Sequence, residues 1–236
     1  MLKRIRFATR RSDLAGDGFA NAWREAARVA TDAPPEVRPT RVTVSVALPA
    51  ITPDPKHDGI GLEWFLDADH LARYEAWAEG PGAPAVDDAL GRALDVAASP
   101  VLVADEVVMR GGTWLEQRWQ QGGDKLKHMA IAHRAHGLTP AQFSERWKSR
   151  AGVVQVPGQA NAVTIPDRAR GLAYVQNHQQ IRPDHEWAYD AFNEVYFDDE
   201  DSLRQRVDWF KETVGGLTEQ DLVSEGWFVA AREEVL

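Results

Sequence analysis

The sequence contains no cysteine. This absence excludes disulfide bonds, catalysis by a thiolate and zinc sites built from cysteine. It fits a protein of the reducing cytoplasm, which is the location we expect. No apolar run approaches the length of a membrane-spanning helix, and the first residues lack the apolar core of a signal peptide. We therefore expect no membrane partner.

Positive charge is also scarce. Lys and Arg number 27 against 36 Asp and Glu, which gives a net charge of −9. The basic residues between Lys3 and Arg11 alternate with Ile5 and Phe7, as in a strand with one polar face. Binding to a phosphate backbone needs a cluster of Lys and Arg. The sequence therefore predicts no nucleic-acid partner.

The motifs of common cofactors and metals are missing as well. There is no glycine-rich phosphate loop, no GxGxxG after a strand and no Gly-x-Ser-x-Gly elbow. His128, His133 and His136 are separated by five and three residues, and the first two would point to opposite faces of a strand. We predict neither a cofactor nor a metal site.

An internal repeat organises the chain. Two triads share spacings of nine and four residues: Arg10, Phe19 and Trp23, and Arg134, Phe143 and Trp147. The segment 57–65 mirrors 189–197, because each has an Asp seven residues before a Phe. We therefore predict a first repeat at 1–110, a connector at 111–124 and a second repeat at 125–236. Trp114 and Trp119 of the connector are expected to pack across the joint.

Each repeat shows the periodicity of a mixed α and β domain. Residues 4–10 and 42–48 alternate between apolar and polar, as half-buried strands do, while 19–30 has a helical apolar stripe. In the second repeat, Thr139, Pro140 and Gln142 mark a helix start with a capping box. The order β-α-β-β-α-β, twice over, is the ferredoxin-like signature. The predicted fold class is α+β.

The second repeat resembles the EthD family. The resemblance lies in the basic strand end at Arg134, the helix with Phe143 and Trp147, the strand 174–178, and the strand 190–197. It implies a ferredoxin-like fold whose sheets pair into a dimeric α/β barrel, and two copies in one chain would close that barrel internally. One departure matters: the His that family members often carry four residues after the Trp is replaced here by Ala151.

The residues expected to bind a substrate lie on one face of the sheet. His128, Ala130, Ala132 and Arg134 share a strand face by period two, and we expect it to line a cavity between the two sheets. The alternating set of Met129, Ile131 and His133 is expected to meet the helices. The predicted substrate-binding residues are Arg134, His128, Tyr196 and Arg6. A solvated edge is the alternative for this polar face.

Two pairs are the catalytic candidates. His178 and Tyr174 share a face, and an imidazole with a phenol can serve as base and acid. The alternative is a structural His at a strand end. Asp190 and Glu194 share a face with aromatic residues, which would raise the pKa of a carboxyl group and suit it to proton transfer. In the alternative, Asp190 caps the strand and Glu194 pairs with Arg134.

The resemblance implies function only broadly. EthD-like proteins include cofactor-independent decarboxylases and cyclases of aromatic polyketides. We therefore expect a cofactor-independent lyase or cyclase that acts on a small hydrophobic, aromatic or polyketide-like molecule. The alternatives are a binding protein for a hydrophobic metabolite and a cofactor-free monooxygenase of phenolic substrates. Because one chain would hold both halves of the barrel, the protein is expected to be a monomer or a homodimer.

Overall fold

A computed structural model describes residues 1–122, 124–156, 159–182, 185–214 and 221–236. Within them, eight antiparallel strands close into a barrel in the order β1-β3-β2-β10-β5-β9-β8-β4. These strands are β1 (Leu2–Ala8), β2 (Arg41–Ala47), β3 (Gly59–Phe65), β4 (Val101–Arg110), β5 (Lys125–Arg134), β8 (Ala173–Gln179), β9 (Ala191–Phe197) and β10 (Val223–Val235). Closure leaves the sheet without an unpaired edge.

Each half of the chain contributes one four-stranded sheet. The first half gives the order β4-β1-β3-β2, and the second gives β10-β5-β9-β8. The halves join where β2 pairs with β10 and where β4 pairs with β8. The predicted α+β fold, with two ferredoxin-like repeats that close one barrel within the chain, is confirmed. The repeat boundaries at residues 110 and 125 stay a prediction.

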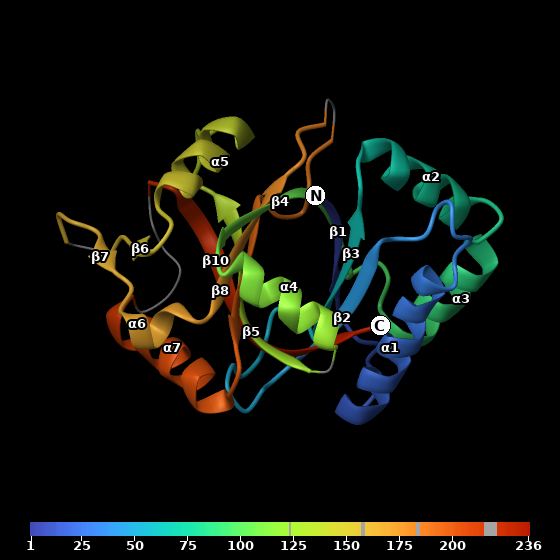
Figure 1. The fold of residues 1–236 in the computed structure, drawn as a ribbon, viewed down its shortest axis with the longest axis horizontal. Helices are drawn as coiled ribbons and strands as arrows, with labels where there is room; N and C mark the ends of the chain where they lie inside the picture. Colours follow the sequence, from blue (N-terminus) through green and yellow to red (C-terminus); the bar gives the residue numbers. More distant parts are fainter. Residues whose placement is uncertain (123, 157–158, 183–184, 215–220) are drawn as a thin grey trace.

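Helices flank the barrel on two sides (Figure 1). The first half carries α1 (Gly16–Thr31), α2 (Ala68–Glu79) and α3 (Ala83–Ala93). The second carries α5 (Pro140–Ser149), a hairpin of β6 (Val153–Val154) and β7 (Val163–Thr164), α6 (Asp167–Arg170) and α7 (Glu200–Thr213). The predicted capping box of α5 is present: the Thr139 hydroxyl accepts from the Gln142 amide, and Gln142 reciprocates.

The interior of the barrel is filled by large apolar side chains. Ile5, Leu62, Met129 and Ile131 belong to this central cluster and are fully buried. Ala132, on the opposite face of β5, packs instead against Phe143 of α5. The expectation that the small-residue face lines a space between the sheets is therefore wrong. Small residues let a helix approach the sheet, whereas the interior of an eight-stranded barrel needs bulk to fill it.

The connector between the halves is a helix, α4 (Gly112–Gln121), that crosses the barrel (Figure 1). Leu115 and Trp119 join the central cluster. The Trp119 ring lies 5.5 Å from that of Trp64 in the first half and 6.3 Å from that of Tyr196 in the second. Trp114 also lies 6.3 Å from Tyr196. The expected packing of the connector tryptophans is confirmed.

In the part of the chain that the structure describes, no helix combines the length and the apolar character that crossing a bilayer requires.

Candidate functional site

The barrel interior holds a cluster of buried charges. Lys3 Nζ lies 2.6 Å from both Glu106 Oε2 and Glu194 Oε1, and Lys127 Nζ lies 2.5 Å from Glu194 Oε2. Lys127 also pairs with Glu233. These contacts join the two halves, because Lys3 and Glu106 come from the first and the others from the second. The cluster therefore links the two halves of the barrel through buried ion pairs.

Two of the predicted site residues, Glu194 and Tyr196, belong to this cluster. The Tyr196 hydroxyl donates to Glu194 Oε2 at 2.7 Å, and both residues are fully buried. Burial alone would raise the pKa of Glu194, but the positive charges of Lys127 and Lys3 outweigh it and hold that pKa below its usual value. The expected raised pKa is therefore wrong. The alternative pairing of Glu194 with Arg134 is wrong too, since Glu194 pairs with lysines.

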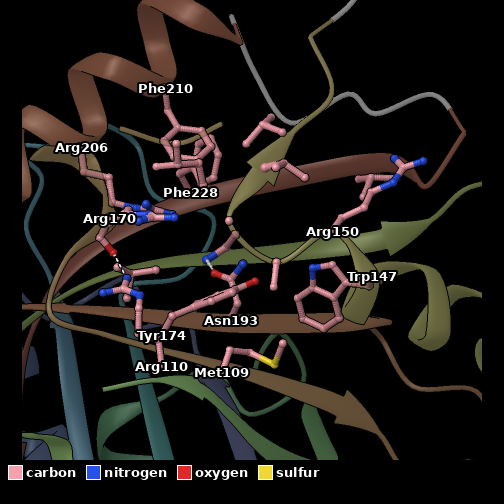
Figure 2. Close-up of a pocket in the computed structure, with 18 of the residues that line it drawn as sticks. Met109, Arg110, Trp147, Arg150, Arg170, Tyr174, Asn193, Arg206, Phe210 and Phe228 are labelled. Atoms are coloured by element: carbon pink, nitrogen blue, oxygen red, sulfur yellow. Dashed lines mark hydrogen bonds between the residues drawn. The ribbon is translucent and has the colours of Figure 1, made fainter. Parts of the chain in front are cut away.

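A cavity of about 200 Å³ lies on the helix-facing side of the second sheet. Strands β4, β5, β8, β9 and β10 form one wall, and α5, α6, α7 and the hairpin β6–β7 form the other. The lining is mostly apolar with a few polar side chains (Figure 2): Met109, Arg110, Ala130, Trp147, Arg150, Ala151, Gly152, Val153, Val154, Ile165, Arg170, Tyr174, Asn193, Val195, Arg206, Phe210, Leu222, Val223 and Phe228. Such a mixture is typical of a small-molecule site.

The space between helices and sheet is smaller in the first repeat, where Trp23 fills it. Trp23 of α1 packs flat on Gly61 of β3, where an added Cβ would lie only 2.7 Å from the indole. In the second repeat Asn193 takes the place of Gly61. Arg6 stands in the first repeat where Ala130 lines the cavity in the second. The space left between sheet and helices in the first repeat is about 40 Å³.

Arg206 forms the inner polar end of the cavity. It comes from the apolar stripe of α7 and is only 5% exposed. Its Nε donates to His128 Nδ1 at 2.9 Å, and its Nη1 donates to the Ala169 carbonyl at 2.5 Å. Burial lowers the pKa of Arg206 to about 9, so the guanidinium remains charged at neutral pH. Among the described residues, no carboxylate lies within ion-pairing distance of Arg206.

The predicted binding residue His128 supports Arg206 from behind and does not line the cavity. Because its Nδ1 accepts a hydrogen bond, its proton resides on Nε2, for which no described residue is a partner. Burial, with a smaller effect of the Arg206 charge, holds the pKa of His128 well below its usual value. His128 is therefore a neutral positioning group for Arg206.

The predicted pair Tyr174 and His178 is brought together through Gln176. The Gln176 Nε2 donates to the Tyr174 oxygen at 2.8 Å and to the Trp147 carbonyl at 3.3 Å. A carbonyl only accepts, so the Gln176 Oε1 must face His178 Nε2, 3.1 Å away. His178 Nδ1 then accepts from the Ser144 hydroxyl at 2.7 Å. Tyr174 lines the cavity, whereas His178 lies behind Trp147 with both nitrogens occupied.

Stability should depend on pH through His178. Burial, helped by the nearby charge of Lys148, lowers the pKa of His178 from 6.5 to about 4. Between these values the unfolded chain takes up a proton that the folded protein does not. The contribution of His178 to the free energy of unfolding should therefore decrease by about 1.4 kcal/mol for each unit by which the pH is lowered across this window. Urea denaturation of the wild type at pH 7, 6 and 5 measures the slope.

The matched variant for this prediction is His178→Asn, which keeps a hydrogen-bonding side chain but cannot titrate. Its unfolding free energy should depend less steeply on pH than that of the wild type between pH 6.5 and 4. Equal slopes would mean that His178 does not contribute. His57, whose pKa burial also lowers to about 4, is unchanged in both proteins and cancels in the comparison.

The other predicted residues lie outside the cavity. Asp190 accepts at 2.9 Å from the backbone of Arg134 and also pairs with its guanidinium, at the end of β5. Gln179 Nε2 donates to the same carboxylate at 2.6 Å. Asp190 therefore holds a strand end, as the alternative reading had it. Arg6 lies on the outer face of the first sheet, where burial lowers its pKa to about 10.

Five polar lining residues were not predicted from the sequence: Arg110, Arg150, Arg170, Asn193 and Arg206. Arg206 carried a signal, because it shares the helical stripe of Leu203, Val207 and Phe210, where a charged residue is unusual. The hairpin β6–β7 and α6 also went unpredicted. Their signal is that the stretch between Trp147 and β8 is longer than the one between Trp23 and β2.

No family model matches the chain, and no curated protein matches it. Solved structures do. An anthrone oxidase-like protein aligns with a TM-score of 0.51 and 10% identity, over 100% of this chain and 91% of that one. A candidate monooxygenase from Lactobacillus acidophilus NCFM aligns with a TM-score of 0.47 and 12% identity, over 100% and 98%. A chlorite dismutase mutant from Candidatus Nitrospira defluvii reaches 0.42 and 10%, over 98% and 90%. At 10% identity, the likeness to the anthrone oxidase-like protein shows a shared fold and no more.

Proposed function

We propose that the second-repeat cavity binds a small hydrophobic molecule, aromatic or polyketide-like, and that the protein is a cofactor-independent enzyme acting on it. The observation that carries this proposal is the asymmetry of the repeats. In the first repeat, the Trp23 ring packs against Gly61 and fills most of the space between helix and sheet. The second repeat has a largely apolar cavity, which Tyr174, Asn193 and Arg206 line. An unfilled cavity lowers the stability of a protein, so we expect this cavity to be retained because a ligand binds in it.

The chemistry that these groups support best is proton transfer next to a carbonyl group. In a decarboxylation, the bond to the departing carbon dioxide breaks and its electron pair forms an enolate, which then takes a proton on carbon. In a cyclisation, removal of a proton gives the enolate, whose carbon attacks a second carbonyl. In this proposal Tyr174 gives or takes the proton, and Arg206 stabilises the oxyanion.

Asn193 provides a further donor in the cavity. Its Oδ1 accepts from the Ala130 amide at 3.0 Å, which turns its Nδ2 the other way. No described residue accepts a hydrogen bond from Nδ2. In this proposal Asn193 binds a carbonyl oxygen of the substrate, and His178 positions Tyr174 through Gln176 rather than touching the substrate.

A relationship to the EthD family remains part of the proposal. The shared barrel fold supports it, as do Phe143 and Trp147, which stack with ring centroids 5.8 Å apart on α5. The position of the family His is Ala151, which lines the cavity here. A mechanism without that His is therefore proposed. We further propose a cytoplasmic protein that is a monomer or a homodimer.

A non-catalytic binding protein is the second candidate. The observation that favours it is the lack of His, Asp and Glu among the described lining residues, which leaves Tyr174 as the one ordinary proton-transfer group there. A cofactor-free monooxygenase is the third, favoured only by the fold shared with an anthrone oxidase-like protein.

One set of assays separates the three candidates. Ligand retained by the purified protein is identified by native mass spectrometry, and that compound and its close analogues are then incubated with wild type and with Tyr174→Phe. For the proposed enzyme, carbon dioxide or a cyclised product forms, and Tyr174→Phe lowers turnover by roughly 10²–10⁴-fold while binding persists. Oxygen consumption with a phenol identifies the monooxygenase. Tight binding without any product identifies the binding protein and overturns the catalytic proposal.

A further inference from the structure

The described cavity lining contains four arginines and no acidic residue. Two of the arginines are neutralised elsewhere. Arg150 Nη1 lies 3.1 Å from Asp221 Oδ1, and Arg170 Nη1 lies 3.1 Å from Asp167 Oδ1. Arg110 and Arg206 differ, because no described carboxylate pairs with either. The cavity therefore has an excess of positive charge, in a protein whose net charge is −9.

The contacts of the two unneutralised arginines are with neutral acceptors. Arg110 Nη1 donates to the Gly171 carbonyl at 2.7 Å, and Arg206 donates to the Ala169 carbonyl and to the neutral ring of His128. Arg110 is exposed, so water screens its charge, whereas Arg206 is buried. Removing a guanidinium from water without a counter-ion is costly, so a charged group buried as deeply as Arg206 is normally paired. Arg206 is buried by the apolar rings of Phe210 and Phe228, and its guanidinium carbon lies 4.5 Å from the Phe210 centroid.

The two ends of the cavity differ in chemistry. Figure 2 shows Arg206, Arg110, Arg170 and Tyr174 gathered at one end, with Trp147 and Arg150 at the other. A planar guanidinium matches a carboxylate in shape and in hydrogen-bond geometry. An indole and apolar side chains match a flat ring.

We infer that the ligand of this cavity is a small aromatic acid whose carboxylate binds between Arg206 and Arg110 while its ring extends toward Trp147. The inference rests on the proposed function for the location of the site, and it adds the charge and the orientation of the ligand.

A purely structural role for Arg206 makes a different prediction. In that case its contacts with His128 and Ala169 would be its whole purpose, and the protein would bind a neutral ring as tightly as an acid. The distinction can be measured on the unaltered protein by titration calorimetry with 2-naphthoate and with its neutral isostere 2-naphthamide.

We expect 2-naphthoate to bind roughly 10- to 100-fold more tightly than the amide, as for other hydrogen bonds to charged groups. Arg206→Met should abolish this preference, and Arg206→Lys should keep part of it. The matched control is Arg6→Met, which removes a half-buried guanidinium from the first repeat, outside this cavity. Among the described residues, no carboxylate forms an ion pair with Arg6. The preference of Arg6→Met should equal that of the wild type.

The possible results distinguish failure of this inference from failure of the proposal that the cavity binds a small hydrophobic molecule. Equal affinity for the acid and the amide would overturn the inference that the ligand carries a carboxylate. The cavity would then remain a binding site for neutral molecules. Binding of neither compound overturns both. Since the comparison of acid with amide needs no variant, it decides the matter even if Arg206→Met fails to fold.

Discussion

Replacing Glu194 by Leu should lower the free energy of unfolding by about 3–5 kcal/mol, the usual cost of leaving buried charges without their partner. Glu194 accepts from Lys3 and from Lys127, and all three side chains are 0% exposed. Without the carboxylate, two ammonium groups would remain in the barrel interior with less compensation. Equilibrium denaturation by urea, followed by tryptophan fluorescence, measures the change.

The control for this prediction is a pair on the surface. Glu25 of α1 pairs with Arg28 at 2.6 Å, but its side chain is 64% exposed. Glu25→Gln should change stability by no more than about 1 kcal/mol, because water already screens exposed pairs. A Glu194→Leu protein as stable as Glu25→Gln would show that the interior charges do not depend on one another.

The same cluster explains why the barrel holds together as one unit. Lys3 belongs to the first half and Glu194 to the second, so the contact would be lost if the halves separated. Thr43 of the first half adds a 2.8 Å hydrogen bond to Glu233 of the second. We therefore expect wild type and Glu25→Gln to unfold in one transition, without a stage in which one repeat alone is folded.

The fold could be predicted from the sequence because large aromatic residues occur at the same spacings in both repeats. Phe19 and Trp23 match Phe143 and Trp147, and both pairs lie on the helix that follows the first strand of a repeat. Period two sorted the residues of β5 into the right two sets. It could not tell which set faces inward, because both faces of a helix-covered barrel strand are buried. Met129 and Ala130 were therefore assigned to the wrong sides.

The site was less predictable because the cavity exists only where the second repeat lacks the close packing that Trp23 and Gly61 provide in the first. Tyr174 could be picked out as a polar aromatic residue on a strand. Glu194 was chosen for the same kind of reason, yet its partners Lys3 and Lys127 are distant in sequence and only the closed barrel brings them together. No periodicity indicates that Trp147 leaves space over Asn193 where Trp23 fills it over Gly61.

Filling that space should weaken ligand binding without harming the fold. Ala130→Leu places a larger side chain where the first repeat has Arg6, directly into the cavity. We expect ligand affinity to fall by roughly 5- to 150-fold, since overpacking an occupied site typically costs about 1–3 kcal/mol and each 1.4 kcal/mol is tenfold. The free protein should lose little stability, because the new methyl groups enter empty space. Calorimetry with 2-naphthoate and urea denaturation measure the two quantities.

Ala132→Leu is the matched control, on the same strand and the same face. Ala132 is packed against Phe143, Ala191 and Leu222, and it does not line the cavity. The larger side chain should therefore destabilise the protein by about 1–3 kcal/mol while the folded molecules still bind the ligand. The two variants are thus expected to show opposite patterns: Ala130→Leu is stable and binds the ligand weakly, and Ala132→Leu binds it normally and is less stable. If Ala130→Leu bound 2-naphthoate as tightly as the wild type does, the ligand would have to bind elsewhere, because the cavity cannot hold both the leucine side chain and the ligand.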